Sequence, residues 1–69
     1  MRIFVNYIEI KIFNGARVDD DIRAYYAKLE RRIPDRLPIA WDKYNNKIAH
    51  DGRLSDGNHI YIKIKPPRK

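Results

Sequence analysis

The chain has 69 residues, enough for one small domain, and it contains no cysteine, which excludes disulfide bonds and any chemistry that needs a thiol. Lys and Arg number 15 against 9 Asp and Glu, and this net charge of +6 favours a nucleic acid, an anionic surface or an acidic protein as partner, unless it serves only solubility. No stretch approaches the roughly 20 apolar residues of a membrane span. The N-terminal segment lacks a signal-peptide core, so we expect a cytoplasmic protein that does not enter a membrane.

Two short strands that form a tight hairpin are predicted between residues 2 and 13. Asn6 and Tyr7 are the residues left for the turn between them. Asn tolerates the positive φ that two-residue turns require, whereas Tyr adopts it poorly. β-Branched residues alternate with other side chains in both strands, which is the pattern of a sheet buried on one face. The inward set is Ile3, Val5, Ile8, Ile10 and Ile12.

A helix is predicted after the break at Asn14 and Gly15. Its start is marked by Asp19, Asp20 and Asp21. We expect one of them to cap the helix, and all three lie where the helix dipole favours negative charge. Consecutive helical residues point in different directions, so a capped helix start explains this acidic triplet better than a metal site does.

The buried face and the end of this helix also follow from the sequence. Pro34 disfavours helical geometry at the residue before it, so we expect the helix to end near Arg32 or Ile33, with Arg31 and Arg32 in the last turn. Apolar residues at helical spacing predict the face that packs on the sheet. They are Ile22, Tyr25 or Tyr26, Leu29 and Ile33, with Val18 as a further candidate.

Two short strands and a turn are predicted after a loop at residues 34–38. The strands are Ile39–Asp42 and Lys47–Ala49, and the turn-rich segment Lys43–Asn46 joins them. Trp41 is expected to complete the core.

Two Asp-Gly turns lead into the last predicted strand, His59–Lys65. Asp precedes Gly in turns because its carboxylate accepts hydrogen bonds from nearby backbone N–H groups. We therefore assign structural rather than catalytic roles to Asp51 and Asp56. The inward residues of the last strand are Ile60, Ile62 and Ile64.

The predicted order of elements is β-β-α-β-(β)-β, an α+β fold in one domain over residues 1–69. A helix and a sheet each have one apolar face to bury. We therefore expect the single helix to pack across one face of a mixed sheet.

Two segments of the chain resemble the β-grasp (ubiquitin-like) superfamily. The stretch IFVNYIEIKIFNGARVDDDI, residues 3–22, is similar to the opening hairpin and helix entry of the ThiS/MoaD-type sulfur carriers, which the chain resembles most. The stretch LSDGNHIYI, residues 54–62, is similar to their closing segment, which TGS domains also share. The resemblance implies a β-grasp fold, in which the first and last strands lie side by side.

The end of the chain departs from the sulfur-carrier pattern. A carrier ends in Gly-Gly because its terminal carboxylate must enter an activating enzyme. This sequence ends in Pro66, Pro67, Arg68 and Lys69. We therefore do not expect sulfur transfer or conjugation, unless a longer precursor carries the two glycines.

Residue patterns for a catalytic, cofactor-binding or metal site do not stand out. His50 and His59 have only Asp51 as a further ligand candidate, which is a weak signal for a metal. Ser55 is the one serine of the chain and belongs to a turn. We therefore expect a protein that is not an enzyme and that has no cofactor.

The outward side chains of the first and last strands give the candidate site, because aromatic residues alternate there with basic ones. Three interpretations remain open: cross-strand pairing that only stabilises the sheet, docking of a protein partner, or stacking of nucleic-acid bases as in a TGS-like module. We expect a protein partner, with RNA or single-stranded nucleic acid as the alternative, and the oligomeric state is not predicted. The candidate face consists of Arg2, Phe4, Lys11, Tyr61, Lys63 and Lys65.

Overall fold

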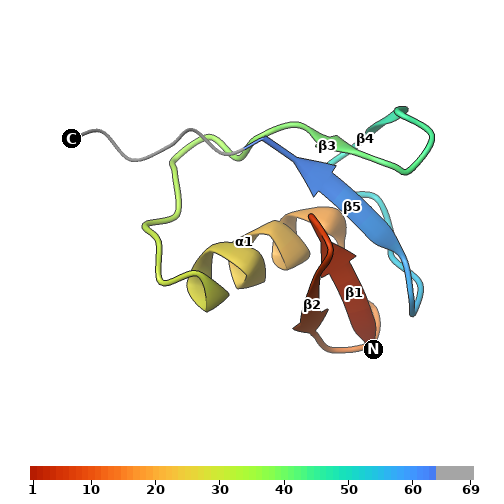
Figure 1. Cartoon of the computed structure of the whole chain (residues 1–69), viewed down its shortest axis with the longest axis horizontal. Helices are drawn as coiled ribbons and strands as arrows, with labels where there is room; N and C mark the ends of the chain where they lie inside the picture. The colour runs from red at the N-terminus through yellow and green to blue at the C-terminus, as the bar shows by residue number, and fades with distance from the viewer. Residues whose placement is uncertain (64–69) are drawn as a thin grey trace.

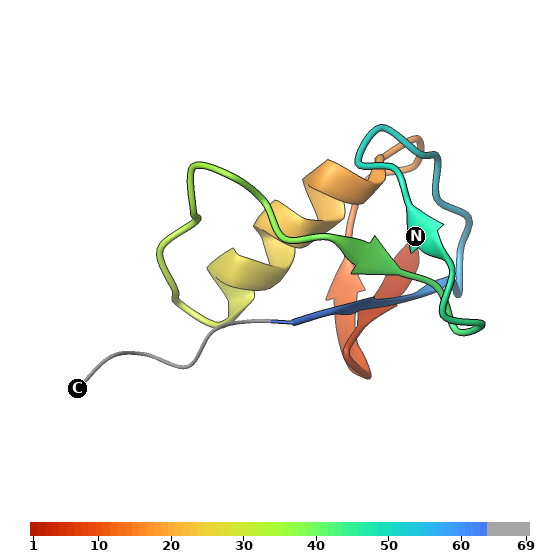
Figure 2. The ribbon, with the colours of Figure 1, turned by 90° about the horizontal axis from the view of Figure 1, so that it is seen from above.

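A computed structural model describes residues 1–63. One helix lies against one side of a five-stranded sheet, whose strands follow the order β2-β1-β5-β3-β4 (Figures 1 and 2). The strands β1 and β5 are parallel and the other neighbours are antiparallel, so the expected α+β arrangement of one helix and a mixed sheet is confirmed. The elements are β1 (Arg2–Val5), β2 (Ile8–Lys11), α1 (Val18–Lys28), β3 (Ala40–Trp41), β4 (Lys47–Ile48) and β5 (His59–Ile62).

The core lies between α1 and the inner face of the sheet. Strand alternation sends the β-branched residues of β1, β2 and β5 inward, as predicted, although Ile8 and Ile12 are only partly buried and Ile64 lies outside the described residues. The side chains that form the buried cluster are each at most 6% exposed. They are Ile3, Val5, Ile10, Val18, Ile22, Tyr25, Tyr26, Ala40, Ile60 and Ile62.

The turn between β1 and β2 joins the hairpin to the last strand. Asn6 and Tyr7 have φ angles of 48° and 68°, the left-handed geometry that two-residue hairpin turns need. The Asn6 side chain donates from Nδ2 to the carbonyl oxygen of Ile62 at 2.9 Å, and its Oδ1 accepts the Ile62 N–H at 3.0 Å. Nδ2 also lies 3.4 Å from the hydroxyl of Tyr25 on α1. One side chain therefore connects the hairpin, β5 and the helix.

The helix begins one residue before the predicted acidic triplet, and its first N–H groups are satisfied by a distant turn. Arg17 occupies the cap position, and the Asp20 carboxylate accepts the Arg17 N–H at 3.0 Å. The N–H groups of Val18 and Asp19 donate to the carbonyl oxygens of Gly52 and His50 at 3.0 Å and 2.8 Å. The first Asp-Gly turn is therefore a structural cap for α1.

The second Asp-Gly turn holds the start of β1. The carboxylate of Asp56 accepts the Arg2 N–H at 2.6 Å, and the N–H of Gly57 donates to the Arg2 carbonyl oxygen at 2.7 Å. The carboxylate of Asp56 therefore accepts an N–H from the other end of the chain, rather than from the nearby backbone as the sequence predicted.

The predicted end of the helix is wrong. The helix ends at Lys28, several residues before Pro34, because the chain turns into a left-handed conformation at Glu30, with φ 55°. The N–H of Glu30 donates to Ala27 and that of Arg31 to Tyr26, both at 3.0 Å, which closes the last turn in a Schellman motif. Ile33, predicted to lie in the core, is consequently 41% exposed.

Asp21 has an environment that the sequence did not predict. It is fully buried on α1, and neither carboxylate oxygen has a hydrogen-bond partner among the described residues. Burial raises the pKa of Asp21 to about 7, because desolvation disfavours the charged form.

Within residues 1–63, we find no helix with the length and apolar character that crossing a bilayer requires.

We predict that Asn6→Gly lowers the free energy of unfolding by about 1–3 kcal/mol, because it removes both hydrogen bonds to Ile62 while keeping a residue that tolerates positive φ. Asn45→Gly is the matched control, since Asn45 also has a left-handed backbone, with φ 69°, in the exposed turn between β3 and β4. Urea denaturation measures both variants. Equal stabilities for the two would show that the Asn6 side chain contributes nothing.

We predict that the stability of the protein contains a component from Asp21 that falls as the pH rises. Its pKa in the folded protein, about 7, lies above the ordinary 3.8. The folded state therefore binds more protons than the unfolded chain between these values, and the stabilisation present below pH 3.8 is lost by about pH 7. The loss is at most about 4 kcal/mol.

The Asp21→Asn variant isolates this component. It should unfold at a higher temperature than the parent protein at pH 7.5, and the difference should shrink at pH 4. Asp35→Asn, at an exposed carboxylate of the loop after α1, controls for the loss of one negative charge. Parallel melting-temperature profiles for the parent and Asp21→Asn would contradict the prediction.

Candidate functional site

Aromatic side chains gather on the face of the sheet opposite α1. Phe4 on β1 lies directly across from His59 on β5, and Tyr61 on β5 lies across from Trp41 on β3. Tyr7 reaches the same group of rings from the hairpin turn. We call these five residues, Phe4, Tyr7, Trp41, His59 and Tyr61, the aromatic face.

Ring contacts connect four members of this face, namely Phe4, Tyr7, His59 and Tyr61. The rings of Phe4 and His59 are stacked, with centroids 4.7 Å apart and planes 12° from parallel. Rings that lay side by side in one plane could not approach so closely, so the faces of these two rings are in contact. Tyr7 meets the rings of His59 and Tyr61 at steep angles, with centroid distances of 6.1 Å and 5.5 Å. One face of the Phe4 ring and one face of the His59 ring are therefore covered by each other.

Two polar groups of the aromatic face are affected by this packing. The hydrogen bond with Tyr7, followed by desolvation, raises the pKa of the Tyr61 hydroxyl. The Nδ1 atom of His59 is buried and has no hydrogen-bond partner within the described part of the chain. Both effects accompany the contacts among the rings of Tyr7, His59 and Tyr61.

Charged residues border the aromatic face. Arg2 and Lys11 lie opposite each other on β1 and β2, and Lys47 on β4 lies opposite Trp41. Glu9 is the acidic member of this border and lies opposite Phe4. The border is therefore mainly basic, which matches the charge of the whole chain.

The structure places the predicted candidate face only in part. Arg2, Phe4 and Lys11 lie together as expected, and Tyr61 lies on the same side of the sheet. The register of β1 and β5 places His59, not Tyr61, opposite Phe4. The ring of His59 stacks with both of them. Lys63 follows β5 and lines a cavity near the end of α1, and Lys65 falls outside the described residues.

The prediction that Trp41 completes the core is wrong. Its neighbour Ala40 takes the inward position, opposite Ile48 and Ile62, so alternation turns Trp41 outward, where it is half-buried. Tyr7 was missed because it was assigned only to a turn. A tyrosine where a hairpin turn favours glycine was the signal that could have found it.

The two histidines have separate roles. His50 donates from Nε2 to the carbonyl oxygen of Pro38 at 2.7 Å, whereas His59 belongs to the aromatic face. The described residues contain no group of three or more His, Asp or Glu side chains arranged to hold a metal ion.

Comparison with protein-family models, curated proteins and solved structures returned no match. The aromatic face is therefore assigned as the candidate site from its geometry alone. Its clearest feature is Tyr7, which is 77% exposed and yet keeps a left-handed backbone. That backbone costs a residue with a Cβ atom roughly 1–2 kcal/mol, a cost that glycine does not have.

We predict that Tyr7→Gly leaves the free energy of unfolding within about 1 kcal/mol of the parent value. The relief of backbone strain offsets the loss of the ring contacts with His59 and Tyr61, which are of similar size. Tyr7→Ala keeps the strain and loses the ring contacts, so it should be less stable than Tyr7→Gly. Urea denaturation compares the three proteins. If Tyr7→Ala were as stable as Tyr7→Gly, the turn would not be strained.

Proposed function

We propose that this chain is a non-catalytic module of β-grasp architecture that binds a protein partner through the aromatic face. The β-grasp assignment is supported by the mixed sheet, by the parallel pairing of the first and last strands at its centre, and by the single helix packed on one side. The binding assignment is supported by an apolar centre with a charged border, which is the usual anatomy of a protein–protein interface.

The exposure of Tyr7 is the observation that carries the proposal. A ring that served only to stabilise the sheet would bury more of its surface than Tyr7 does. The ring contacts of Tyr7 do no more than offset the cost of holding tyrosine in a backbone conformation that favours glycine. Tyr and Trp are enriched among the residues that dominate binding energy at interfaces. Tyr7, Tyr61 and Trp41 supply such residues on one side of the sheet.

The stacking of Phe4 on His59 favours a protein partner over a nucleic acid. Bases stack on the flat faces of aromatic rings, and the facing surfaces of Phe4 and His59 are occupied by each other. Single-stranded RNA remains the second candidate because the basic border, with Arg2 and Lys11, also suits phosphate groups. We favour a partner surface that is apolar at its centre and acidic at its edge.

We predict that Phe4→Ala and Tyr61→Ala each weaken binding to the partner by about tenfold or more, the effect of losing a central interface residue. The partner is identified by crosslinking through a photoreactive group placed at position 7. Its affinity is then measured by calorimetry with the purified protein. Ile33→Ala is the control, because Ile33 is 41% exposed on the loop that follows α1 and does not belong to the aromatic face.

Tyr7→Gly distinguishes loss of a contact with the partner from unfolding of the variant. We expect this variant to stay folded and yet to bind the partner more weakly than the parent protein does. Full affinity in all three aromatic-face variants would overturn the proposal. RNA binding that weakens steeply with salt and is lost in the same variants would favour the second candidate instead.

A further inference from the structure

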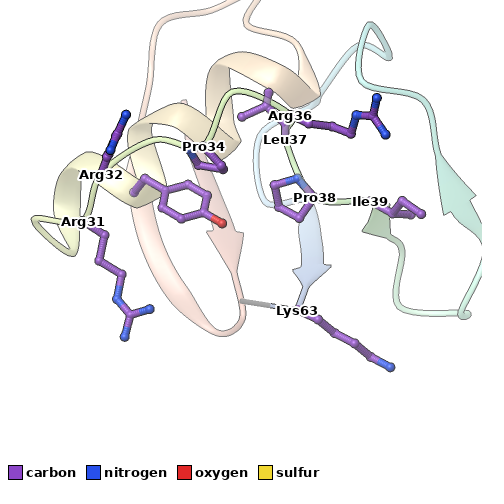
Figure 3. A pocket seen from close by; sticks show the side chains of 9 residues that line it. Arg31, Arg32, Pro34, Arg36, Leu37, Pro38, Ile39 and Lys63 are labelled. Carbon is purple, nitrogen blue, oxygen red and sulfur yellow. The ribbon is translucent and has the colours of Figure 1, made fainter. Parts of the chain in front are cut away.

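A second candidate site is a cavity of about 660 Å³. It lies between the C-terminal end of α1, the loop at residues 30–39 and the end of β5 (Figure 3). Its volume is in the range typical of ligand-binding cavities. The floor is apolar and is formed by Tyr26, Pro34, Leu37, Pro38 and Ile39. Ile39 is 47% exposed here, a large share for an isoleucine, so the floor is open to a ligand.

The floor is held in place at both ends of the loop. The hydrogen bonds of Glu30 and Arg31 back to α1 fix the start of the loop. The hydrogen bond from His50 to the carbonyl oxygen of Pro38 fixes its end. Pro34 and Pro38 each have a ring-fixed φ angle, which limits the conformations in between. A ligand would therefore meet a surface that is already shaped, which lowers the entropy cost of binding.

The cavity is strongly positive. Arg31, Arg32, Arg36 and Lys63 line it, and among residues 1–63 no acidic side chain does. Glu30 and Asp35 are the acidic neighbours in the sequence, and neither contributes to the lining. Figure 3 shows Arg31 and Lys63 extending to one side of the floor, and Arg32 and Arg36 extending to the other. Positive charge thus flanks an apolar surface on two sides.

We infer that this cavity binds an acidic peptide segment, with an apolar side chain on the floor and carboxylates on either side of it. An extended peptide can present carboxylates in both directions from an apolar anchor, whereas an amphiphile with a single head group can reach the cations on only one side. Arginine also forms paired hydrogen bonds with a carboxylate, which adds specificity to the charge attraction.

The C-terminal residues of the chain itself are a poor occupant on charge. Residues 64–69 add Lys65, Arg68 and Lys69 and no acidic side chain. Placing them in a cavity lined by four cations would bring like charges together. Complementary charge therefore favours an acidic segment of another protein.

Binding of a fluorescent peptide that has a pair of leucines between runs of acidic residues tests this inference. We expect Arg32→Glu and Arg36→Glu each to weaken binding by about tenfold or more. Lys43→Glu makes the same charge change outside the cavity and should alter affinity by less than about twofold. Ile39→Ser, at an exposed position of the floor, should weaken binding without changing any charge, as should replacing the leucines of the peptide by glycine.

Chemical shifts of the labelled full chain locate the site. Shifts centred on Leu37 and Ile39 support the inference, and shifts centred on Phe4 and Tyr61 overturn it. It is also overturned if dodecanoate or an oligonucleotide binds the cavity more tightly than the peptide, or if Lys43→Glu weakens binding as much as Arg32→Glu. Contacts between Pro67 and Leu37 in the free protein would show that the chain's own C-terminal segment occupies the cavity, and this result would also overturn the inference. Phe4→Ala should leave peptide binding unchanged, so failure here is distinct from failure of the aromatic face.

Discussion

The side-chain amide of Asn6 replaces backbone hydrogen bonds at the point where the parallel ladder between β1 and β5 runs out. The ladder pairs only Phe4 with His59 and Val5 with Ile60 before β1 turns away. Beyond it, Asn6 both donates to and accepts from the backbone of Ile62, as another strand residue would. The N–H groups of Phe4 and Asn6 also donate to the carbonyl oxygens of Asn58 and Ile60. The Asn6 side chain thus extends a register that backbone hydrogen bonds set between two strands from opposite ends of the chain.

This register determines the aromatic face. Strand side chains alternate between two faces, so a slip of β5 by one residue would bring His59 and Tyr61 inward and turn Ile60 and Ile62 out. With the register held, His59 lies against Phe4, and Tyr61 lies within reach of Tyr7. The two residues of the turn, Asn6 and Tyr7, therefore have different roles. Asn6 secures the last strand, and Tyr7 extends the aromatic surface that this strand presents.

Much of the fold could be predicted from the sequence because strand period is a local signal. Alternation in β1, β2 and β5 was sufficient to divide inward from outward residues. The strand β3 has only two residues, Ala40–Trp41, and is too short to show an alternation of inward and outward side chains. Bulk therefore suggested that Trp41 was buried, although the small Ala40 takes the inward position. The pairing partners of β3 decide this, and they come from distant parts of the chain.

The helix shows a different limit. Its end was assigned from Pro34, but the chain leaves the helix earlier because Glu30 adopts a left-handed conformation usually taken by glycine. Its start depends on carbonyl groups of His50 and Gly52, which sequence spacing does not reveal. The burial of Asp21 could not be predicted from local sequence either. A carboxylate in the first turn of a helix is normally solvated, and only the packed structure shows that this one is buried. The structure offers no compensating contact for it among the described residues.

The early end of α1 also creates the cavity. Had the helix continued to Ile33, Arg31 and Arg32 would lie in its last turn and the connection to β3 would be much shorter. Ending at Lys28 leaves residues 30–39 to cross from the helix to β3 (Figure 2). This irregular backbone has no periodic pattern, which is why the candidate site predicted from the sequence contained Lys63 but not the arginines beside it. The left-handed residue Glu30, which the helix prediction did not anticipate, lies at the start of this loop. The loop carries three arginines and most of the apolar floor, on a surface separate from the aromatic face.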